Sequence, residues 1–582
     1  MKRKYTTFSL IITVILLMGN CSSNVQPSPD PSVDEPRQSI TKSDILINQL
    51  GYPVSSVKKA LVRGDVSSFE IRDSSGTSIL SGQIAPQTYW GLSGDSVGVA
   101  DFSELTLLGE YTLCVDGVCS YPFQVGHELY GDLADAALKS YYFARVGIDI
   151  EEEFAGKWHR KGGHPDTEVY IHASAADENR PEGSTLSSPG GWYDAGDYGK
   201  YIVNSNITTW TLLLSYQINR DFHLSQNLHI PESGNHLPDI LDEALVNLRW
   251  MMTMQDPNDG GLYHKLTTKN FDGFIMPADT TMPRFVVMKT TPAALGFCAT
   301  MSSASRLFSQ LEMQDLAGEM KTAAIKAWSW ALEHPEVYYE QPEDINTGAY
   351  GDSSLVDEWY WAAAELYLLT GDAKFKDKMM EHAQDPITPK WDVVNSLGMI
   401  SLLTSERSAE FQTLRASFIA YADSMLQKEQ NCPYLISMDQ FAWGSNSDVA
   451  NDGMLKLIAF QLTGDSKYIA SAQNDLDYIL GRNATGYSFV TGFGHQTPFH
   501  QHNRIMGADG IDDPIPGYIS GGPNTVVLTD CEAQGVVRST YPAASYTDTQ
   551  CSYSTNETAI NWNAPLVFLT TGLEAYYTNQ PK

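Results

Sequence analysis

Apolar residues recur every three or four positions along most of the chain after residue 126. In the stretch 237–252, for example, Leu237, Leu241, Ala244, Leu248 and Met252 fall on one face of a helix, because an α-helix turns once in about 3.6 residues. Stretches of the same kind predict further helices at 128–144, 201–218, 290–311, 315–332, 355–370, 408–428, 448–463, 467–480 and 559–577. Long loops rich in Gly, Pro and Asp separate them, so this part of the chain is predicted to be an all-α domain of stacked helical hairpins.

One helix junction occurs twice in this part. Residues 370–372 and 463–465 both read Thr-Gly-Asp. Glycine can end one helix in a left-handed conformation, and Asp can cap the next. The same antiparallel helix turn is therefore predicted at both places.

Short apolar runs replace the helical pattern between residues 43 and 126. Runs near 45–50, 60–62, 69–71, 97–99, 111–113 and 121–123 are separated by Gly, Ser and Asp, which predicts a small β-sandwich. Within it, Cys114 and Cys119 enclose Val-Asp-Gly-Val, in which Asp-Gly is typical of a two-residue hairpin turn. The two cysteines then face each other where side chains approach closely, so a disulfide between them is predicted.

Composition limits the possible partners. The chain has 582 residues, of which 38 are basic and 70 acidic, giving a net charge of −32. Such a charge argues against nucleic acid, because phosphate is repelled, but it leaves a neutral polymer such as a polysaccharide open. At this length two or more domains are expected.

The first 42 residues predict export. Lys2, Arg3 and Lys4 precede an apolar run at 8–18 that is too short to span a bilayer, so residues 1–20 are predicted to be a signal peptide. Residues 17–21, Leu-Met-Gly-Asn-Cys, resemble a bacterial lipobox in which Cys21 is lipidated. Residues 21–42 are then a lipoprotein tether. The protein is expected to be a monomeric outer-membrane or cell-surface lipoprotein, the alternative being a periplasmic or secreted protein.

A loop at 191–201 sets two carboxylates three residues apart. Asp194 and Asp197 enclose Ala-Gly, with Trp192 and three tyrosines around them. Gly and Asp at this density disfavour a helix interior. Two such carboxylates stay ionised only if a polar ligand, a water molecule or a cation lies between them, and the aromatic rings offer flat apolar faces of the kind on which sugars stack. The alternative is a turn in which the Asp side chains bond to local amides.

Two further stretches carry candidate functional side chains. Glu557 lies just before the helix predicted at 559–577, where the helix dipole stabilises a carboxylate, and on its own it would be a helix cap. His502 and Arg504 lie two residues apart in a loop, where they can hold hydroxyl groups or a carboxylate. Their alternatives are a buried, hydrogen-bonded ring for His502 and a loop-anchoring ion pair for Arg504.

Together these stretches resemble glycoside hydrolase family 9, the inverting β-1,4-glucanases. The Asp-Ala-Gly-Asp loop at 194–197, the His-x-Arg element at 502–504 and the run from Tyr546 to Ala564 occur in the family's order. Residues 47–52 resemble the start of the immunoglobulin-like module that precedes many of these catalytic domains. The resemblance implies a multidomain protein with an immunoglobulin-like β-sandwich at 43–126 and an (α/α)6-barrel catalytic domain at 127–582. It also implies an endo-β-1,4-glucanase that cleaves a plant-type β-glucan by direct attack of water.

The resemblance assigns roles to four carboxylates. Asp197 corresponds to the general base and Asp194 to a residue that helps to hold the attacking water. Glu557 corresponds to the general acid, so its pKa is expected to be raised by burial or by a neighbouring carboxylate. Asp548 corresponds to a residue that supports this site. In an inverting enzyme the acid and base lie roughly 6.5–9.5 Å apart, which leaves room for water.

Four more residues are predicted to bind substrate. His502 and Arg504 correspond to ligands of the sugar next to the cleaved bond. Trp192 and Tyr553, the aromatic residues inside the two motifs, are also predicted to contact sugar. Family members often carry adjacent histidines before the arginine, whereas this chain has Asn503, which affects the details of sugar contact rather than the reaction.

A structural calcium ion is predicted at the start of one helix. Residues 352–358 resemble the family's calcium loop, and calcium prefers several oxygen ligands from one compact loop. The predicted ligands are Asp352, Asp357, Glu358 and Asp392. The alternative is a helix cap at Asp352, with the next two carboxylates solvated.

No zinc, and no cofactor for the chemistry, is expected. Some family members bind zinc through Cys and His residues before the Asp-Ala-Gly-Asp loop, but this chain has only His159, His164 and His172 there. The acidic pair Asp242-Glu243 lies inside a predicted helix and is expected on its solvated face.

Three other functions fit parts of the sequence. An exo-acting β-glucosidase or glucosaminidase would need one end of the cleft blocked on the same framework. A non-catalytic surface glycan-binding lipoprotein would share the anchor and the aromatic residues, but it has no need of Asp194, Asp197 and Glu557 together. An isoprenoid cyclase on a similar helical barrel fits Asp-rich loops but neither export nor the stretch around Glu557.

Overall fold

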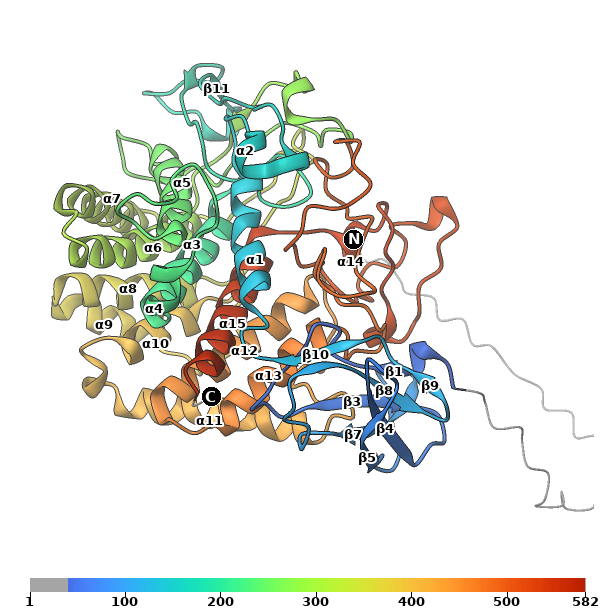
Figure 1. Cartoon of the computed structure of the whole chain (residues 1–582). Coiled ribbons are helices and arrows are strands. Elements are labelled where there is room, and N and C mark those ends of the chain that lie inside the picture. Colours follow the sequence, from blue (N-terminus) through green and yellow to red (C-terminus); the bar gives the residue numbers. More distant parts are fainter. Residues whose placement is uncertain (1–39, 581–582) are drawn as a thin grey trace, which may run out of the picture. The chain divides into compact units, whose positions relative to one another are not determined.

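The computed structural model describes residues 40–580 (Figure 1). The predicted signal peptide at 1–20 and most of the tether predicted at 21–42 lie outside the described residues. Within 40–580, a β-sandwich precedes a helical domain and fifteen α-helices are present, so the predicted order of the two parts is confirmed. The second part is not purely α-helical, because it also contains a five-stranded sheet within residues 169–286, whose strands are too short to show in the hydrophobic pattern. In the same range no helix has an apolar stretch of the length that crossing a membrane requires.

Two sheets form the β-sandwich. The first has the strand order β1 (Ile45–Leu46), β3 (Lys59–Arg63), β7 (Asp95–Asp101), β6 (Thr88–Trp90). The second has the order β2 (Gly51–Pro53), β10 (Phe123–Gly126), β8 (Gly109–Val115), β4 (Ser68–Asp73), β5 (Ser78–Gln83), with β9 (Val118–Cys119) paired to β8. Tyr52, Phe102 and Phe123 are buried in the sandwich core, with ring centroids 5.2, 5.7 and 5.4 Å apart. Strands β5 and β6 were not predicted because most of their side chains are exposed and lack apolar alternation.

The hairpin between β8 and β9 has the predicted form. Asp116 and Gly117 both have positive φ, as a two-residue hairpin turn of this kind requires. Cys114 pairs with Cys119 across the two strands, and the two form a disulfide. The predicted disulfide is therefore confirmed.

Twelve of the helices are at least nine residues long within the described range. They are α1 (Gly131–Ala144), α3 (Ile202–Ile218), α5 (Asp239–Thr253), α6 (Thr291–Gln310), α7 (Gln314–Glu333), α8 (Val356–Thr370), α9 (Ala373–Glu381), α10 (Asn395–Thr404), α11 (Gln412–Gln430), α12 (Ser445–Thr463), α13 (Lys467–Ile479) and α15 (Ile560–Thr578). The short helices are α2 (Glu152–Ala155), α4 (Arg220–Ser225) and α14 (Tyr553–Asn556). All ten helices predicted from periodicity are confirmed, whereas α10 was missed and α9 was indicated only by the Thr-Gly-Asp junction before it.

Six of these helices pack in succession on one another. Helix α3 contacts α6, α6 contacts α8, α8 contacts α10, α10 contacts α12, α12 contacts α15, and α15 contacts α3. They are buried on nearly all sides, as nine of the ten residues of α10 illustrate. Helices α1, α5, α7, α9, α11 and α13 pack against members of this set. An inner layer of helices is thus covered by a second one.

The repeated Thr-Gly-Asp junction adopts one conformation at both places. Gly371 and Gly464 end α8 and α12 in the left-handed region, with φ of 71° and 73°. Asp372 and Asp465 then accept hydrogen bonds from the backbone N–H groups of residues 374 and 467. The predicted helix turn is confirmed twice.

The β-sandwich packs directly against the helical domain. Asn48 donates a 2.9 Å hydrogen bond to Asp477 on α13, and the N–H of Gln49 donates to the carbonyl of Leu480 at 2.9 Å. The side-chain oxygen of Gln49 accepts from the N–H groups of His495 and Gln496, both at 2.8 Å. These contacts fix the start of the segment that leads to His502.

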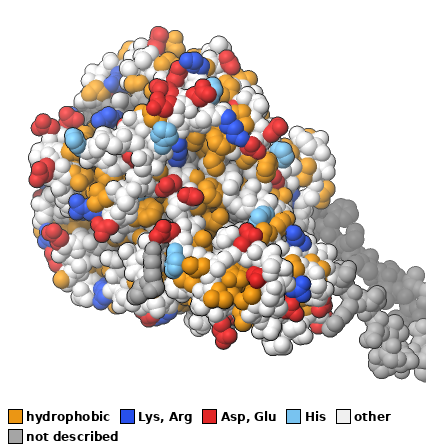
Figure 2. Space-filling view, viewed as in Figure 1, with side chains coloured by type: hydrophobic (Ala, Val, Ile, Leu, Met, Phe, Trp, Pro, Cys, Tyr) orange, Lys and Arg blue, Asp and Glu red, His pale blue; other side chains and the backbone are white. Residues whose placement is uncertain are grey.

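The acidic pair on α5 is not solvated as predicted. Glu243 is 0% exposed and accepts a hydrogen bond from Arg145 at 2.6 Å, while Asp242 is buried and bonded to Asn235. Loop residues cover the polar side of this helix, which a periodic pattern within the helix does not reveal. Elsewhere on the surface, Figure 2 shows acidic side chains dispersed over the face rather than gathered in one patch.

Candidate active site

The Asp-Ala-Gly-Asp loop lies between a small sheet and the last helix. The sheet has the order β12 (Thr185–Leu186), β11 (Val169–Ile171), β15 (Phe285–Val286), β14 (Lys265–Thr267), β13 (Lys200–Tyr201). The loop runs directly into β13. The N–H of Asp194 donates to the carbonyl of Gly199 at 3.1 Å, and the carbonyl of Asp194 accepts from the N–H of Ile560 at 2.8 Å. Both ends of the loop are thereby fixed.

Asp194 is buried and accepts three hydrogen bonds. The amide of Asn204 donates to both carboxyl oxygens at 3.0 Å, and the hydroxyl of Tyr350 donates at 2.8 Å. Burial and then the nearby Asp197 raise its pKa to about 8. At neutral pH the side chain is therefore mostly protonated, which removes the repulsion that two adjacent carboxylates would otherwise suffer.

This burial makes stability depend on pH. A carboxyl whose folded pKa is raised binds more protons in the folded state, so its contribution favours folding at low pH and is lost as pH rises from about 4 to about 8. We expect Asp194→Asn to abolish this part of the pH dependence. Urea unfolding at pH 5 and pH 9 checks it: the wild type should lose more stability than the variant over this interval, and equal losses would contradict the assignment.

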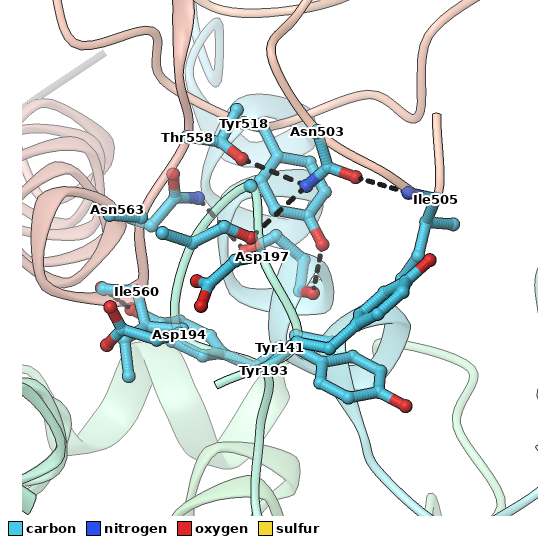
Figure 3. A pocket seen from close by; sticks show the side chains of 16 residues that line it. Tyr141, Tyr193, Asp194, Asp197, Asn503, Ile505, Tyr518, Thr558, Ile560 and Asn563 are labelled. Atoms are coloured by element: carbon cyan, nitrogen blue, oxygen red, sulfur yellow. Dashed lines mark hydrogen bonds between the residues drawn. The ribbon is translucent and has the colours of Figure 1, made fainter. Parts of the chain in front are cut away.

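Asp197 lies three residues on and borders the small cavity drawn in Figure 3. One of its oxygens accepts from the N–H of Gly199 at 3.1 Å and from the hydroxyl of Tyr201 at 2.9 Å. Both of these hydrogen bonds go to the same oxygen of Asp197, whereas Asp194 accepts hydrogen bonds on both of its oxygens.

Lys265 lies behind these carboxyls and was not predicted. Its ammonium donates to the carbonyl of Gly348 at 2.5 Å, to the hydroxyl of Thr347 at 3.2 Å and to Gln341 at 3.1 Å, and it lies 5.6 Å from the centre of the Tyr201 ring. It ties down the segment that ends at Tyr350. Tyr350 itself has a φ of 51°, an uncommon value that this anchoring supports.

Glu557 enters the site from the C-terminal motif. It follows α14 directly, and one of its oxygens accepts from the N–H of Gly196 at 3.3 Å. Burial and then the charge of Asp197 raise its pKa well above the usual value, while the charge of Arg504 opposes this shift. A raised pKa is the direction that the sequence led us to expect for this carboxyl.

Gly196 joins the two motifs. Because Glu557 contacts the residue just before Asp197, the carboxyls of Glu557 and Asp197 are no more than about 12 Å apart. A Cβ atom at position 196 would lie only 2.0 Å from the carbonyl oxygen of His502. Glycine is therefore needed here for close approach of two backbone segments. The three acidic side chains that the sequence singled out do converge on one place.

His502 is held through one ring nitrogen by a residue of another loop. Its Nδ1 lies 2.7 Å from the carbonyl oxygen of Gln550, so Nδ1 carries the proton and Nε2 is left as an acceptor in the neutral ring. Burial lowers its pKa, which favours this neutral form. A parallel bridge pairs its backbone with that of Glu557. A sugar hydroxyl can donate to Nε2.

Arg504 is largely engaged by the backbone. Its side chain donates to the carbonyls of Asp272 and Gly196, both at 2.7 Å, and its guanidinium lies 5.1 Å from the centre of the Phe271 ring. Backbone carbonyls therefore hold the Arg504 side chain, rather than the ion pair that was predicted as the alternative. It fixes the loop that carries Asp197.

Asp548 supports the site from one side. Its two oxygens accept from the N–H groups of Phe499 and His500, at 2.9 Å each, and from the amide of Asn556 at 3.0 Å. It thereby joins the segment before His502 to the residue before Glu557. This geometry is that of a positioning residue rather than one that meets substrate.

Partly exposed aromatic rings form a row beside Glu557. The ring centre of Trp443 lies 5.3 Å from that of Tyr553, Tyr553 lies 5.9 Å from His502, and His502 lies 5.4 Å from Phe274. Trp443 is 44% exposed and Phe274 37%. Tyr553 and His502 of this row were predicted, whereas Trp443 and Phe274 were not, because spacing does not distinguish a surface ring from a core ring.

Trp192 does not belong to this row. It is 0% exposed, its ring centre lies 4.6 Å from that of Tyr141, and its N–H points to the buried Glu243. A ring so enclosed cannot contact a sugar, so the prediction that Trp192 binds substrate is wrong. Its place in the motif reflects packing of the loop against α1 and α5.

A small cavity of about 20 Å³ lies behind the loop (Figure 3). This is enough for one water molecule. Asn503 borders it and donates to the hydroxyl of Thr558 at 3.2 Å. The residue that departs from the family pattern is therefore buried and joins the loops, rather than facing the aromatic row.

The predicted calcium residues lie near one another but are not tightly gathered. Asp357 accepts from the N–H of Val394 at 2.8 Å, close to Asp392, and Asp352 accepts from the N–H groups of the two residues that follow it. The start of α8 has no side-chain cap, so the alternative of a cap at Asp352 is wrong. One oxygen of Glu358 is buried without any partner in the described part of the chain.

The carboxylates of another acidic group lie closer to one another, but they already surround a lysine ammonium. Asp177, Asp256 and Asp259 bring carboxyl oxygens within 4.8 Å of one another, and within 40–580 no other set of three or more His, Cys, Asp or Glu residues does so. The ammonium of Lys289 lies 3.1, 2.7 and 2.8 Å from these carboxylates. The lysine takes the place that a metal ion would have. 

The three histidines considered for zinc have separate surroundings. His164 is buried, with Nδ1 2.8 Å from the hydroxyl of Tyr193, and burial lowers its pKa to about 3. His172 lies 3.0 Å from Asp344, and His159 is exposed.

Comparison with known proteins identifies the family to which the chain is similar. Glycosyl hydrolase family 9 matches residues 130–570, and a cellulase N-terminal Ig-like domain matches residues 41–120. The chain is 42% identical to the xyloglucan-specific endo-beta-1,4-glucanase BoGH9A of Bacteroides ovatus, over 97% of this chain and 98% of the relative. It is 31% identical to endoglucanase D of Acetivibrio thermocellus, over 92% of this chain and 84% of the relative.

Solved structures similar to this one belong to the same family. A Bacteroides ovatus GH9 structure aligns with a TM-score of 0.86 and 41% identity, covering 92% of this chain and all of the other. A thermostable endoglucanase from Alicyclobacillus acidocaldarius aligns with a TM-score of 0.83 and 30% identity, covering 91% and 99%. The chain therefore belongs to glycoside hydrolase family 9 and is a glycoside hydrolase that acts on a polysaccharide.

Proposed function

We propose that this protein is an inverting endo-β-1,4-glucanase whose substrate is xyloglucan. The observation that carries the reaction is the convergence of Asp194, Asp197 and Glu557 around Gly196. The substrate rests on the likeness to the xyloglucan-specific enzyme, which extends over 97% of this chain. The row of rings from Trp443 to Phe274 passes Glu557 and suits a glucan chain that extends beyond the cleaved bond.

In this mechanism each carboxyl has one task. Glu557 donates its proton to the glycosidic oxygen as that bond breaks, and water attacks the anomeric carbon from the opposite face. Asp197 takes the proton from this water. Asp194, protonated, holds the water without adding a second charge beside the base. At the end Glu557 is ionised, Asp197 is protonated, and the new sugar end has inverted configuration.

A product profile tests the proposal. Purified protein is incubated with xyloglucan, a soluble cellulose derivative, mixed-linkage glucan and glucomannan, and early products are separated by size. We expect long oligosaccharides from xyloglucan first, and proton NMR to show the α-anomer as the initial product. Release of glucose alone from the start would mean exo action, and a retained β-anomer would contradict the mechanism.

Trp443 is expected to contribute to binding rather than to chemistry. Its exposed ring next to Tyr553 offers a stacking face, so Trp443→Ala should raise KM for long glucans by roughly 5- to 30-fold, the equivalent of about 1–2 kcal/mol. The kcat value should change little. Tyr89→Ala on β6 is the control, because Tyr89 is exposed on the β-sandwich. Equal effects of the two variants would contradict this role.

We also infer that the helical domain is an (α/α)6 barrel. Twelve long helices within residues 40–580 support this, six of them packing in succession with α15 returning to α3 and six covering them. The loops that carry Asp197, His502 and Glu557 would then gather at one end of the barrel.

A structural calcium ion is proposed at Asp352, Asp357, Glu358 and Asp392. These residues fit a cation because one Glu358 oxygen is buried without a partner, and because burial and neighbouring carboxylates raise the pKa values of Asp357 and Glu358. The nearby Lys390 forms its ion pair with Asp448, at 2.9 Å, rather than with these four residues, whose oxygen atoms are the kind of ligand that calcium prefers. The ion would hold the start of α8 to the segment at 392–394, away from the reaction.

Calcium removal should therefore lower stability. A ligand that binds only the folded state stabilises it by about 2.7 kcal/mol at 100 times its Kd. We expect chelation to lower the Tm of the wild type and added calcium to restore it. Asp357→Asn should lose this response, whereas Asp259→Asn at the lysine-filled group should keep it. No calcium-dependent change in the wild type would contradict the proposal.

We further propose that the protein is a monomeric, exported lipoprotein anchored at Cys21. The lipobox-like segment supports the anchor, and the disulfides Cys114–Cys119 and Cys531–Cys551 support an oxidising compartment. Mass analysis of the mature N-terminus tests it. A diacylated Cys21 is expected, and Cys21→Ala should release the protein from the membrane fraction.

A further inference from the structure

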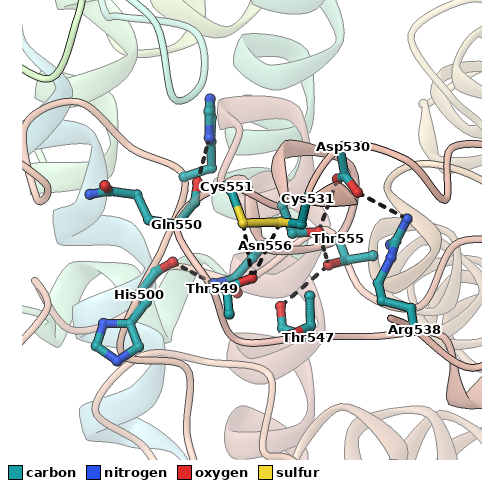
Figure 4. The surroundings of a disulfide bond; sticks show 12 residues. His500, Asp530, Cys531, Arg538, Thr547, Thr549, Gln550, Cys551, Thr555 and Asn556 are labelled. Atoms are coloured by element: carbon teal, nitrogen blue, oxygen red, sulfur yellow. Dashed lines mark hydrogen bonds and ion pairs between the residues drawn. A yellow bond between two sulfur atoms is a disulfide. The ribbon is translucent and has the colours of Figure 1, made fainter. Parts of the chain in front are cut away.

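A second disulfide closes a long loop next to Glu557. Cys531 and Cys551 are bonded across a sequence separation of 20, and we call residues 531–551 the disulfide loop (Figure 4). Two short 3-10 turns are its only regular elements. Val537 is 93% exposed, whereas Ala543 is buried and the ring centre of Tyr546 lies 5.1 Å from that of Phe489 in the core. The loop is therefore held by this packing and by specific links at its two ends.

The C-terminal end of this loop contacts one site residue and leads along the chain to another. The carbonyl of Gln550, the residue before Cys551, accepts the 2.7 Å hydrogen bond from Nδ1 of His502. Ser552 follows the disulfide, and helix α14 (Tyr553–Asn556) then leads directly to Glu557. Only a few residues separate the disulfide from the proposed acid, so displacement of Cys551 moves both groups.

The N-terminal end is joined to the same segment through Asp530. Its carboxylate accepts from the N–H of Ser554 at 3.0 Å and from the hydroxyls of Ser554 and Ser552 at 2.7 and 3.0 Å. It also pairs with Arg538 at 3.2 Å, both side chains being almost fully buried. The disulfide sits beside this ion pair and holds Asp530 against α14 (Figure 4).

We infer that the Cys531–Cys551 disulfide is a positioning element for the reaction: it sets His502 through Gln550 and Glu557 through Asp530 and α14. This inference rests on the proposed function, in which Glu557 is the general acid. A disulfide that acted only as a staple would stabilise the fold mainly by restricting the unfolded chain, wherever it lay. The two roles are separable because only the first affects proton donation.

The test compares two disulfide variants. Cys531→Ser/Cys551→Ser removes the disulfide of interest, and Cys114→Ser/Cys119→Ser removes the hairpin disulfide of the β-sandwich as the control. Each is assayed on phenyl and 2,4-dinitrophenyl β-cellotriosides. These substrates differ only in the leaving group, and the acidic dinitrophenol departs without protonation whereas phenol needs a general acid.

We expect the loop variant to lose about 10-fold or more in kcat on the phenyl glycoside and less than about 3-fold on the dinitrophenyl one. Any rise in KM caused by displacement of His502 should be the same on both substrates, and the control variant should match the wild type on both. Equal losses on the two substrates, or no loss, would overturn the inference. Glu557→Gln is run alongside: if it too shows no difference between leaving groups, the proposed function fails; if it shows the difference and the loop variant does not, only the positioning role fails.

Reduction of the wild-type protein gives a second measurement that needs no refolding of a variant. One dithiothreitol molecule supplies two electrons and two protons, so each disulfide becomes two thiols while the reagent closes to its cyclic disulfide. The wild type and the hairpin control should lose phenyl-glycoside activity after reduction and regain it on reoxidation. The loop variant should not respond. If reduction lowered the activity of the loop variant as much as that of the wild type, this would contradict the inference.

Discussion

Replacing Asp197 by Asn is expected to lower kcat by about 10³-fold or more, because general base catalysis typically contributes 10²–10⁴-fold. The amide cannot accept the proton of the attacking water. It is nearly the same size, and its oxygen can still accept from Gly199 and Tyr201, so the loop should keep its position. Initial rates on xyloglucan oligosaccharides, with KM determined separately, measure the loss.

Two controls make this result specific. Circular dichroism and Tm should match the wild type, and oligosaccharide binding should be retained, since Asp197 is not part of the aromatic row. Asp194→Asn should be milder than Asp197→Asn, because Asp194 is already protonated near neutral pH with a pKa of about 8. Turnover by Asp197→Asn near the wild-type rate would contradict its role as base.

The different surroundings of these two carboxyls lie beyond what the sequence could tell. The motif places them three residues apart, which is visible in the chain, but the partners that distinguish them come from far away. Tyr350, which donates to Asp194, is 156 residues distant, and Lys265 reaches residues 347 and 348 more than 80 positions later. A polar residue in a loop carries no periodicity, so no local pattern identifies these groups.

The fold was predictable where a helix has one apolar face. Helix α5 shows such a face and was predicted within two residues at each end. Helix α10 was missed because nine of its ten residues are buried, so apolar residues occur all round and no stripe remains. Helix α9 has no periodic pattern and was indicated only by the junction before it, since only Phe375 and Met379 of its nine residues are buried.

The sequence was sufficient to predict which residues form the candidate site, but not which way their side chains point. The order of the motifs identified Asp197, His502 and Glu557, and the structure brings them together. Trp192 and Glu243 illustrate this. Trp192 was predicted to contact sugar and Glu243 to face solvent, but both are completely buried. Which way a side chain points depends on what covers it, and here loops from distant parts of the chain do so.

Replacing Glu557 by Gln is expected to have the second large effect, and one that depends on the leaving group. Glutamine keeps the size of the side chain and can still accept from the N–H of Gly196, but it cannot donate a proton. We expect kcat on the phenyl cellotrioside to fall by about 10²–10⁴-fold, and the loss on the dinitrophenyl cellotrioside to be much smaller.

The pH profile gives an independent check on the same residue. Burial and the neighbouring Asp197 raise the pKa of Glu557, so in the wild type the acid stays protonated to higher pH than an ordinary Glu. Activity on a poor leaving group should therefore fall as pH rises through this raised pKa, and Glu557→Gln should lack this alkaline decline. An unchanged alkaline decline in the variant would assign it to another group. The raised pKa depends on closeness to Asp197, so the same arrangement that provides the base also keeps the acid protonated.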